Sequence, residues 1–403
     1  MALIIASASE VHGDQQPQSQ NLINNLRASD VKLRRAAAER LDQTTLDQLQ
    51  ADMGKQLSET MGSLVQGYRS SQDLMVKSAA ARVLVILATA EACDGEIIRA
   101  TGAIRVLLKT LDAKDLYTRK LAGSALAKLF HADAGRQALT EIPSGLKSLI
   151  EGARAKEDFF GGINEKEVNV EVAKATAIFC DSEIGREAFI QVKGALKALI
   201  SWFCWPKVHE MRSSALNAIA NVCKSDRGIG AFIREEGVVS LTACLKDGKN
   251  DRETLFQAAI VFLTLSQSNA GREEVNPEHF LEGCLTCLKL QDKELSFTGF
   301  QVLNNLITNK KLTIRESSKK ILMECLVSLA NSGDSRMEDI ACEWILQRFD
   351  KMPGPYFWSL DSRINELASI NGLMDALFLA FKFNDSKRVL RAFAVVSQSI
   401  ERH

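Results

Sequence analysis

Residues that interrupt helices or favour strands are scarce in this chain. Its 403 residues include only 6 prolines, 3 tyrosines and 4 tryptophans. Proline breaks helices and large aromatic side chains favour strands, so their scarcity favours helix along most of the chain. Many stretches are instead rich in alanine, leucine, lysine and glutamate, which form helices readily. The composition therefore predicts an all-α protein.

The sequence also lacks net charge, because 50 basic residues balance 50 acidic ones. This balance argues against binding bulk nucleic acid or an anionic membrane through excess positive charge. Apolar residues make up 46% of the chain, an ordinary share for a globular protein, which argues against wholesale disorder. We expect no specific nucleic-acid partner.

Features of membrane and secreted proteins are missing as well. The longest uncharged apolar stretch, near residues 256–270, is shorter than the roughly 20 residues that cross a bilayer. No basic residue precedes the short apolar run after Met1, so we expect neither a signal peptide nor membrane insertion. Nine scattered cysteines do not resemble a disulfide framework and are predicted to be small buried side chains. We expect the protein in the reducing cytoplasm or in the nucleus.

One phrase recurs along the chain: a glycine, often an arginine, a few residues with apolar spacing, a second glycine and then an apolar helix pattern. Its first glycines are Gly95, Gly135, Gly185, Gly228 and Gly271, at steps of 40, 50, 43 and 43 residues. A nearly fixed period of this size is typical of a helical solenoid.

Each unit is predicted to contain a short helix, a glycine-marked turn, a second helix, a polar break and a longer third helix. In the unit that begins at Gly95, the second helix covers residues 103–111 and the third covers 116–130. The third helix carries apolar residues at the three-and-four spacing that makes one stripe. Glycine at the turn permits a positive φ or a close approach between helices. Because one unit cannot bury its stripe alone, stacking must stabilise the array.

This pattern, best matched from about Met61 to Leu306, resembles the armadillo repeat. The resemblance implies an all-α, right-handed superhelical solenoid of about eight to nine three-helix units, with HEAT-like or atypical units at the ends. We divide the chain into a disordered tail (1–19), an armadillo/HEAT-like array (20–350), a proline- and aromatic-containing connection (351–360) and an atypical C-terminal capping repeat (361–403).

Two segments stand out from the repeat. Residues 156–166, within the segment 155–167, are predicted to form a lengthened loop between a second and a third helix that adds selectivity for a partner. The stretch 309–320 concentrates basic residues, which either contact phosphate or an acidic partner or are neutralised by the acidic residues that follow.

The armadillo resemblance implies a partner-binding groove, because third helices line the concave face in that family. The implied groove residues are Arg82, Ser124, Lys128, Lys174, Asn217, Asn221, Gln301 and Asn305. Asn221 and Asn305 match the asparagine position that importin-alpha proteins use to bind peptides. No tryptophan occupies the partner position, which disfavours an importin-alpha-like transport adaptor. The alternative is that both asparagines only cap or solvate their helices.

Three of these groove positions, Arg82, Lys128 and Lys174, are basic. Beta-catenin, a member of the same family, binds acidic extended segments through basic groove positions, so the resemblance implies an extended acidic segment as a partner. The alternative is an ordinary solvated charged face.

Motifs for chemistry are weak. Cys284 and Cys287 have the spacing of half a zinc site, but no second pair follows, so core cysteines are predicted. The glycines near Asp226 resemble a nucleotide loop but are explained by a repeat junction. The five histidines are not at ligand spacing. We expect no cofactor, no metal, no small-molecule substrate and no catalysis.

The functional hypothesis is a non-catalytic protein–protein interaction module, serving as an adaptor, a scaffold or a subunit of a larger assembly. An armadillo-type chaperone or a regulator of a GTPase or myosin is the alternative. An enzyme is the third hypothesis and would require a deep pocket with converging ionisable groups. The pair Trp202 and Trp205 is expected to be largely buried, and either one, if exposed, would be an interface anchor.

Overall fold

The computed structural model describes residues 18–26, 28, 30–42, 57–71, 73–88, 102–113, 116–153, 163–205, 208–247, 250–290, 292–308, 327 and 341. The chain divides into two compact units, residues 1–225 and 226–403, which we treat separately. Every regular element in the described ranges is a helix, which confirms the all-α prediction. The predicted connection 351–360, the capping repeat 361–403 and the basic stretch 309–320 lie outside the described residues.

The first unit contains twelve described helices, which follow the predicted order. They are α2 (Gln18–Asn25), α3 (Val31–Asp42), α5 (Leu57–Ser70), α6 (Leu74–Ala88), α8 (Ala103–Thr110), α9 (Leu116–Leu129), α10 (Asp133–Thr140), α11 (Gly145–Gly152), α12 (Ile163–Asp181), α13 (Glu183–Gln191), α14 (Ala195–Phe203) and α15 (His209–Val222). The predicted bounds of α8 and α9 are confirmed to within one residue. Helix α2 includes residues 18 and 19 of the predicted N-terminal tail, and residues 1–17 lie outside the described residues.

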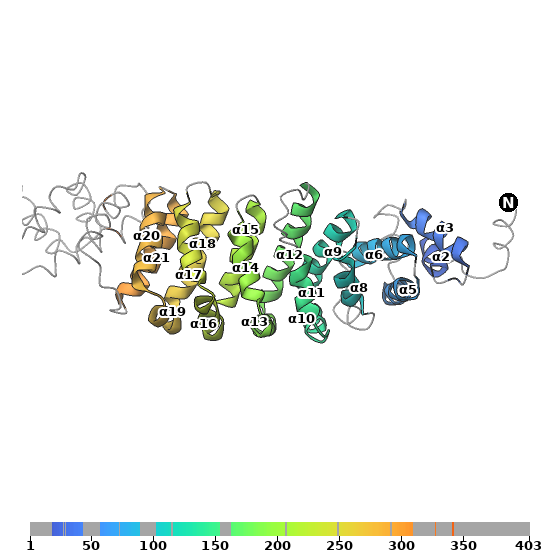
Figure 1. The fold of residues 1–403 in the computed structure, drawn as a ribbon, viewed down its shortest axis with the longest axis horizontal. Coiled ribbons are helices and arrows are strands. Elements are labelled where there is room, and N and C mark those ends of the chain that lie inside the picture. The colour runs from blue at the N-terminus through green and yellow to red at the C-terminus, as the bar shows by residue number, and fades with distance from the viewer. Residues whose placement is uncertain are drawn as a thin grey trace, which may run out of the picture. The chain divides into compact units, whose positions relative to one another are not determined.

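Helices of the same kind pack side by side in the first unit (Figure 1). The third helices α3, α6, α9, α12 and α15 form one row, in which each contacts the next. The second helices α5, α8, α11 and α14 form another row, and the first helices α10 and α13 contact each other. The unit is therefore a stack of helical repeats in three layers, as expected for a solenoid.

The second unit repeats this order. It contains α16 (Asp226–Arg234), α17 (Gly237–Lys246), α18 (Arg252–Gln267), α19 (Asn269–Glu274), α20 (Pro277–Lys289) and α21 (Lys293–Thr308). The first helices α16 and α19, the second helices α17 and α20, and the third helices α18 and α21 pack pairwise. The sequence Asp226–Gly230 is helical, so it is a repeat junction and not a nucleotide loop.

The Gly-Arg phrase at the start of each unit has a physical explanation. A Cβ atom at Gly135, Gly185 or Gly271 would overlap the carbonyl oxygen of the residue six positions earlier, near the end of the preceding third helix. The arginine that follows donates to a carbonyl oxygen at the same helix end, as Arg186 Nη1 does to Asp181 at 2.7 Å. Glycine therefore permits the close junction, and arginine satisfies a carbonyl that the helix leaves unpaired.

Two kinds of turn precede the second helices α8, α11, α14 and α17. Gly102 and Gly194 adopt positive φ angles of 68° and 82°, as predicted for glycine at this junction. In the turns before α11 and α17 the positive φ falls on Ser144 and Glu236, one residue before the glycine. The glycine is then the first helical residue and allows close packing; a Cβ at Gly237 would overlap the ring of Phe232.

The predicted loop 156–166 is wrong over its last four residues, because α12 begins at Ile163; residues 156–162 lie outside the described residues. Glu165 lies in the first turn of α12, where a negative charge favours a helix. From α9, Arg119 and Lys120 approach Glu165 and Glu167 at 3.8 and 2.7 Å. These charges extend α12 toward its N-terminus and attach it to α9.

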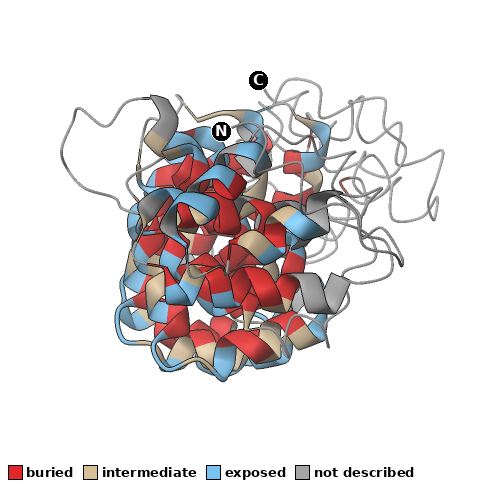
Figure 2. Cartoon of the chain, turned by 90° about the vertical axis from the view of Figure 1, so that its right-hand side faces the viewer, coloured by how far each residue is buried: buried red, intermediate tan, exposed pale blue. Residues whose placement is uncertain are grey.

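Most of the buried residues, red in Figure 2, are apolar and form the core of the described helices. The rings of Phe130 and Phe179 meet edge to face at 5.5 Å between the ends of α9 and α12. Trp202 is 1% exposed, as predicted, whereas Trp205 is half-buried. Buried aromatic contacts of this kind join consecutive repeats.

Cysteines in the described part are mostly core residues. Cys284 and Cys287 are both 2% exposed, as predicted, and burial raises the pKa of the Cys287 thiol to about 12. Burial likewise raises the pKa of Cys180 and Cys223. Cys204, at the end of α14, is exposed, which corrects the prediction for that residue.

We expect iodoacetamide to alkylate Cys204 in the folded protein, and Cys180, Cys223, Cys284 and Cys287 only after unfolding. The thiolate is the reactive form, and these four thiols are buried and have a raised pKa. Mass spectrometry of proteolytic peptides, with and without denaturant, measures the labelling of each site. Rapid native labelling of Cys284 or Cys287 would contradict the packing of α20.

Candidate partner-binding face

The third helices α9, α12 and α15 lie side by side and bring together most of the predicted groove residues of the first unit. We call the surface that carries Ser124, Lys128, Lys174 and Asn217 the third-helix face. Lys128, Lys174 and Asn217 are exposed, and Ser124 is half-buried. Arg82 lies on α6, but its side chain is outside the described part. Gln301 and Asn305 belong to α21 in the second unit and are half-buried.

The two asparagines that match the importin-alpha position bond within the chain. Asn221 is 6% exposed, and its Nδ2 donates to the carbonyl oxygen of Ala177 on α12 at 3.1 Å. In the second unit, Asn305 Nδ2 donates to Ser266 Oγ on α18 at 3.0 Å. Each amide therefore links its third helix to the preceding one.

Replacing Asn221 with alanine should lower the free energy of unfolding by about 1–2 kcal/mol, because it removes a buried hydrogen bond between repeats. Asn217→Ala is the matched control on the same helix. Its side chain is exposed, so the change should stay within about 0.5 kcal/mol. Urea unfolding followed by circular dichroism measures both. Equal losses of stability in the two variants would show that the Asn221 amide does not join α12 and α15.

The basic groove positions are less uniform than the sequence predicts. Lys174 pairs with Glu171 on its own helix at 2.9 Å. Near the C-terminal ends of α15 and α12, Lys224 pairs with Asp181 at 3.1 Å. Lys128 is exposed and forms no ion pair with the described residues. Positive charge on this face is thus partly neutralised within the protein.

Two buried arginines connect the third helices of this face to the second helices. Arg119 Nε donates to the carbonyl oxygen of Leu111 at 2.8 Å, and Arg212 Nε donates to that of Phe203 at 2.8 Å. Each arginine is the fourth residue of a third helix and bonds to the end of the second helix in the same repeat. The third helices are thereby held in place relative to the second helices.

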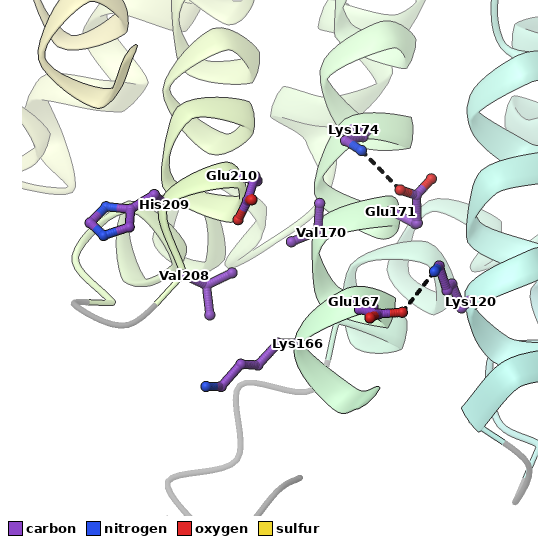
Figure 3. A pocket seen from close by; sticks show the side chains of 9 residues that line it. All are labelled: Lys120, Lys166, Glu167, Val170, Glu171, Lys174, Val208, His209 and Glu210. Carbon is purple, nitrogen blue, oxygen red and sulfur yellow. Dashed lines mark hydrogen bonds and ion pairs between the residues drawn. The ribbon is translucent and has the colours of Figure 1, made fainter. Parts of the chain in front are cut away.

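An open pocket of about 340 Å³ lies at the N-terminal ends of α9, α12 and α15 (Figure 3). It is lined by Lys120, Lys166, Glu167, Val170, Glu171, Lys174, Val208, His209 and Glu210. Glu167 accepts a hydrogen bond from Lys120, which raises the pKa of that lysine. Of the predicted groove residues, only Lys174 lines the pocket.

Sequence reasoning missed the other pocket residues. The predicted groove positions lie in the C-terminal halves of the third helices, whereas most pocket residues lie in their N-terminal halves. Lys120 and Glu167 are 47 positions apart in the sequence and meet only when repeats stack. Charged residues at the first turns of successive third helices were the available signal.

The described part offers little for other kinds of site. Within it, no group of three histidine, cysteine or acidic residues is placed to hold a metal ion. No helix in the described ranges is long and apolar enough to cross a bilayer.

Comparisons with known proteins agree with this architecture. No protein-family model and no curated protein sequence matches the chain. Among solved structures, an engineered protein is similar with a TM-score of 0.62 and 22% identity, over 95% of this chain and 90% of that one. A designed armadillo repeat protein gives a TM-score of 0.50 and 22% identity, over 61% of this chain and 99% of its own.

A second designed armadillo repeat protein, solved in complex with the peptide (KR)4, gives a TM-score of 0.52 and 20% identity, over 61% of this chain and 99% of that one. At these identities the similarity concerns the fold. Together with the three-layered stacking of repeats, it identifies this chain as an all-α solenoid with the armadillo-like repeat fold.

Proposed function

We propose that this chain is a non-catalytic protein-binding module that holds an extended partner segment along the third-helix face of its first unit. The observation that carries the proposal is the row formed by α9, α12 and α15, which carries the exposed Lys128, Lys174 and Asn217 and has an open pocket toward its N-terminal ends. Exposed polar groups in a row can bond to the backbone and side chains of an extended segment.

Two further points support this function. Solenoids generally present extended binding surfaces, and one similar designed protein was solved with a bound peptide. Fold alone does not determine function, so the proposal depends on the residues of the face. The role is that of an adaptor, scaffold or complex subunit, in the cytoplasm or the nucleus as the sequence indicates.

The acidic partner segment inferred from the sequence stays a prediction. The charges that the structure places on the face lead us to modify it. Lys128 can attract an acidic residue, but Lys174 already pairs with Glu171, and Glu210 adds unpaired negative charge nearby. The face therefore has mixed charge, and we propose a partner segment that carries charges of both signs.

A peptide selection tests the function. We would select from a displayed library of random peptides of about 12 residues, which in extended form are longer than the distance across three packed helices. Binding of the enriched peptides would then be measured with Lys174→Glu and Asn217→Arg variants of the full chain. We expect about tenfold weaker binding, because each change alters an exposed side chain at the centre of the face.

Lys197→Glu is the matched control, because Lys197 is exposed on the second helix α14 and not on the third-helix face. Its affinity for the same peptides should equal that of the original chain. The proposal is wrong if no peptide is enriched, or if the enriched peptides bind the Lys174 and Asn217 variants as tightly as the original.

A further inference from the structure

The pocket on the third-helix face has an apolar floor. Val170 on α12 and Val208, just before α15, are its two apolar lining residues, and they are 9% and 7% exposed. The other lining residues are charged or polar. The volume of about 340 Å³ is at the lower end for ligand pockets and leaves room for one aliphatic side chain of a partner.

Four of the six Lys and Glu residues in the pocket neutralise one another. Lys120 pairs with Glu167 at 2.7 Å across α9 and α12, and Lys174 pairs with Glu171 at 2.9 Å within α12. The two pairs thus leave the pocket with no excess of either sign.

Lys166 and Glu210 are the two charged residues that remain. Both are exposed and line the pocket, and neither forms an ion pair with the residues that the structure describes. Lys166 lies in the first turn of α12 and Glu210 in the first turn of α15. Figure 3 shows Val208 between Lys166 and Glu210, and Val170 beside Glu210. The pocket therefore presents the positive charge of Lys166, an apolar surface and the negative charge of Glu210 to a partner.

We propose that this pocket is an anchor subsite for an aliphatic side chain of the partner segment, flanked by an acidic residue that faces Lys166 and a basic residue that faces Glu210. The inference rests on the proposed function and specifies which segments the face accepts. A wholly basic segment would leave Lys166 opposed by like charge, and a wholly acidic one would do the same to Glu210.

The spacing of the helices sets the spacing of the motif. Packed helices lie roughly 8–10 Å apart, and an extended chain advances about 3.3 Å per residue. Side chains at alternate positions of an extended chain point to the same side. The exposed Lys166 and Glu210 side chains add to the distance between the helix axes, so the acidic, aliphatic and basic residues should occupy alternate positions in a segment of about five residues, whose first and fifth residues are about 13 Å apart.

Four fluorescent peptides test the subsite by anisotropy with the full chain. The matched probe contains Asp-Ser-Leu-Ser-Lys between glycine-serine flanks. The second probe replaces leucine with glycine, the third replaces aspartate with lysine, and the fourth replaces lysine with aspartate. We expect the matched probe to bind about tenfold more tightly than each of the other three.

Charge reversal in the protein provides the decisive comparison. In Glu210→Lys, the probe with two aspartates should become the tightest, and in Lys166→Glu the probe with two lysines should. Both residues are exposed, so the variants should keep the circular dichroism spectrum of the original chain.

Equal affinity for all four probes, or the same order of affinities in Glu210→Lys, would overturn the subsite. The library-selected peptides separate this failure from that of the proposed function. If they still depend on Asn217 and Lys174, the third-helix face binds peptides without this motif. If they do not, both proposals fail.

Discussion

Gly185→Ala should lower the free energy of unfolding by about 2–4 kcal/mol. An added Cβ would overlap the carbonyl oxygen of Phe179 and lie 2.8 Å from its carbonyl carbon. Because these atoms belong to the backbone of α12, the start of α13 would have to move away. That movement would weaken the bond from the Gly185 amide to Ser182 Oγ, at 3.0 Å, and the bond from Arg186 to the Asp181 carbonyl.

Gly62→Ala is the matched control for this prediction. Gly62 lies within α5, and a Cβ there would meet no atom within 4 Å. Alanine is the better helix former, so this variant should gain roughly 0.5–1 kcal/mol. Urea unfolding measures both variants. If Gly185→Ala were as stable as the original chain, close backbone contact would not be what holds α12 and α13 together.

Arg119→Met should cost about 2–3 kcal/mol. Arg119 is 4% exposed, and its Nε and Nη2 donate to the carbonyl oxygens of Leu111 and Gly152 at 2.8 and 3.4 Å. These carbonyls stand at the ends of α8 and α11, where a helix leaves its last acceptors unpaired. Methionine retains much of the apolar packing but donates no hydrogen bond, so the loss reports mainly on those bonds.

Lys109→Met makes the same kind of change at an exposed position of α8 and should alter stability by less than about 0.5 kcal/mol. Hydrogen exchange adds a local readout, because in Arg119→Met the amides of α8 and α11 should exchange faster than in Lys109→Met. Similar exchange and similar stability in the two variants would contradict the role assigned to Arg119.

Much of the fold could be predicted because it depends on local and periodic signals. The spacing of the Gly-Arg phrase set the repeat, and the apolar stripe placed α9 within one residue of its observed end. Gly102 and Gly194 have the positive φ predicted for such turns. The start of α12 was missed because its first turn is stabilised by charges on α9, a different element.

The candidate site could be predicted less completely. The exposure of Lys128, Lys174 and Asn217 followed from the phase of the repeat. The same phase does not tell whether an amide points outward, and Asn221 instead bonds to the carbonyl of Ala177 on the neighbouring helix. The pocket depends on residues of three helices, and no single repeat contains its pattern of paired and unpaired charges.

Site-specific photo-crosslinking tests the central claim most directly. Benzoylphenylalanine would be placed at Asn217 on the third-helix face and, in a second protein, at Lys197 on α14; both positions are exposed. Each protein would be irradiated with a library-selected peptide, and the products would be located by mass spectrometry. A partner segment on the third-helix face predicts crosslinking from position 217 and little from position 197. Equal crosslinking from both, or crosslinking only from position 197, would contradict it.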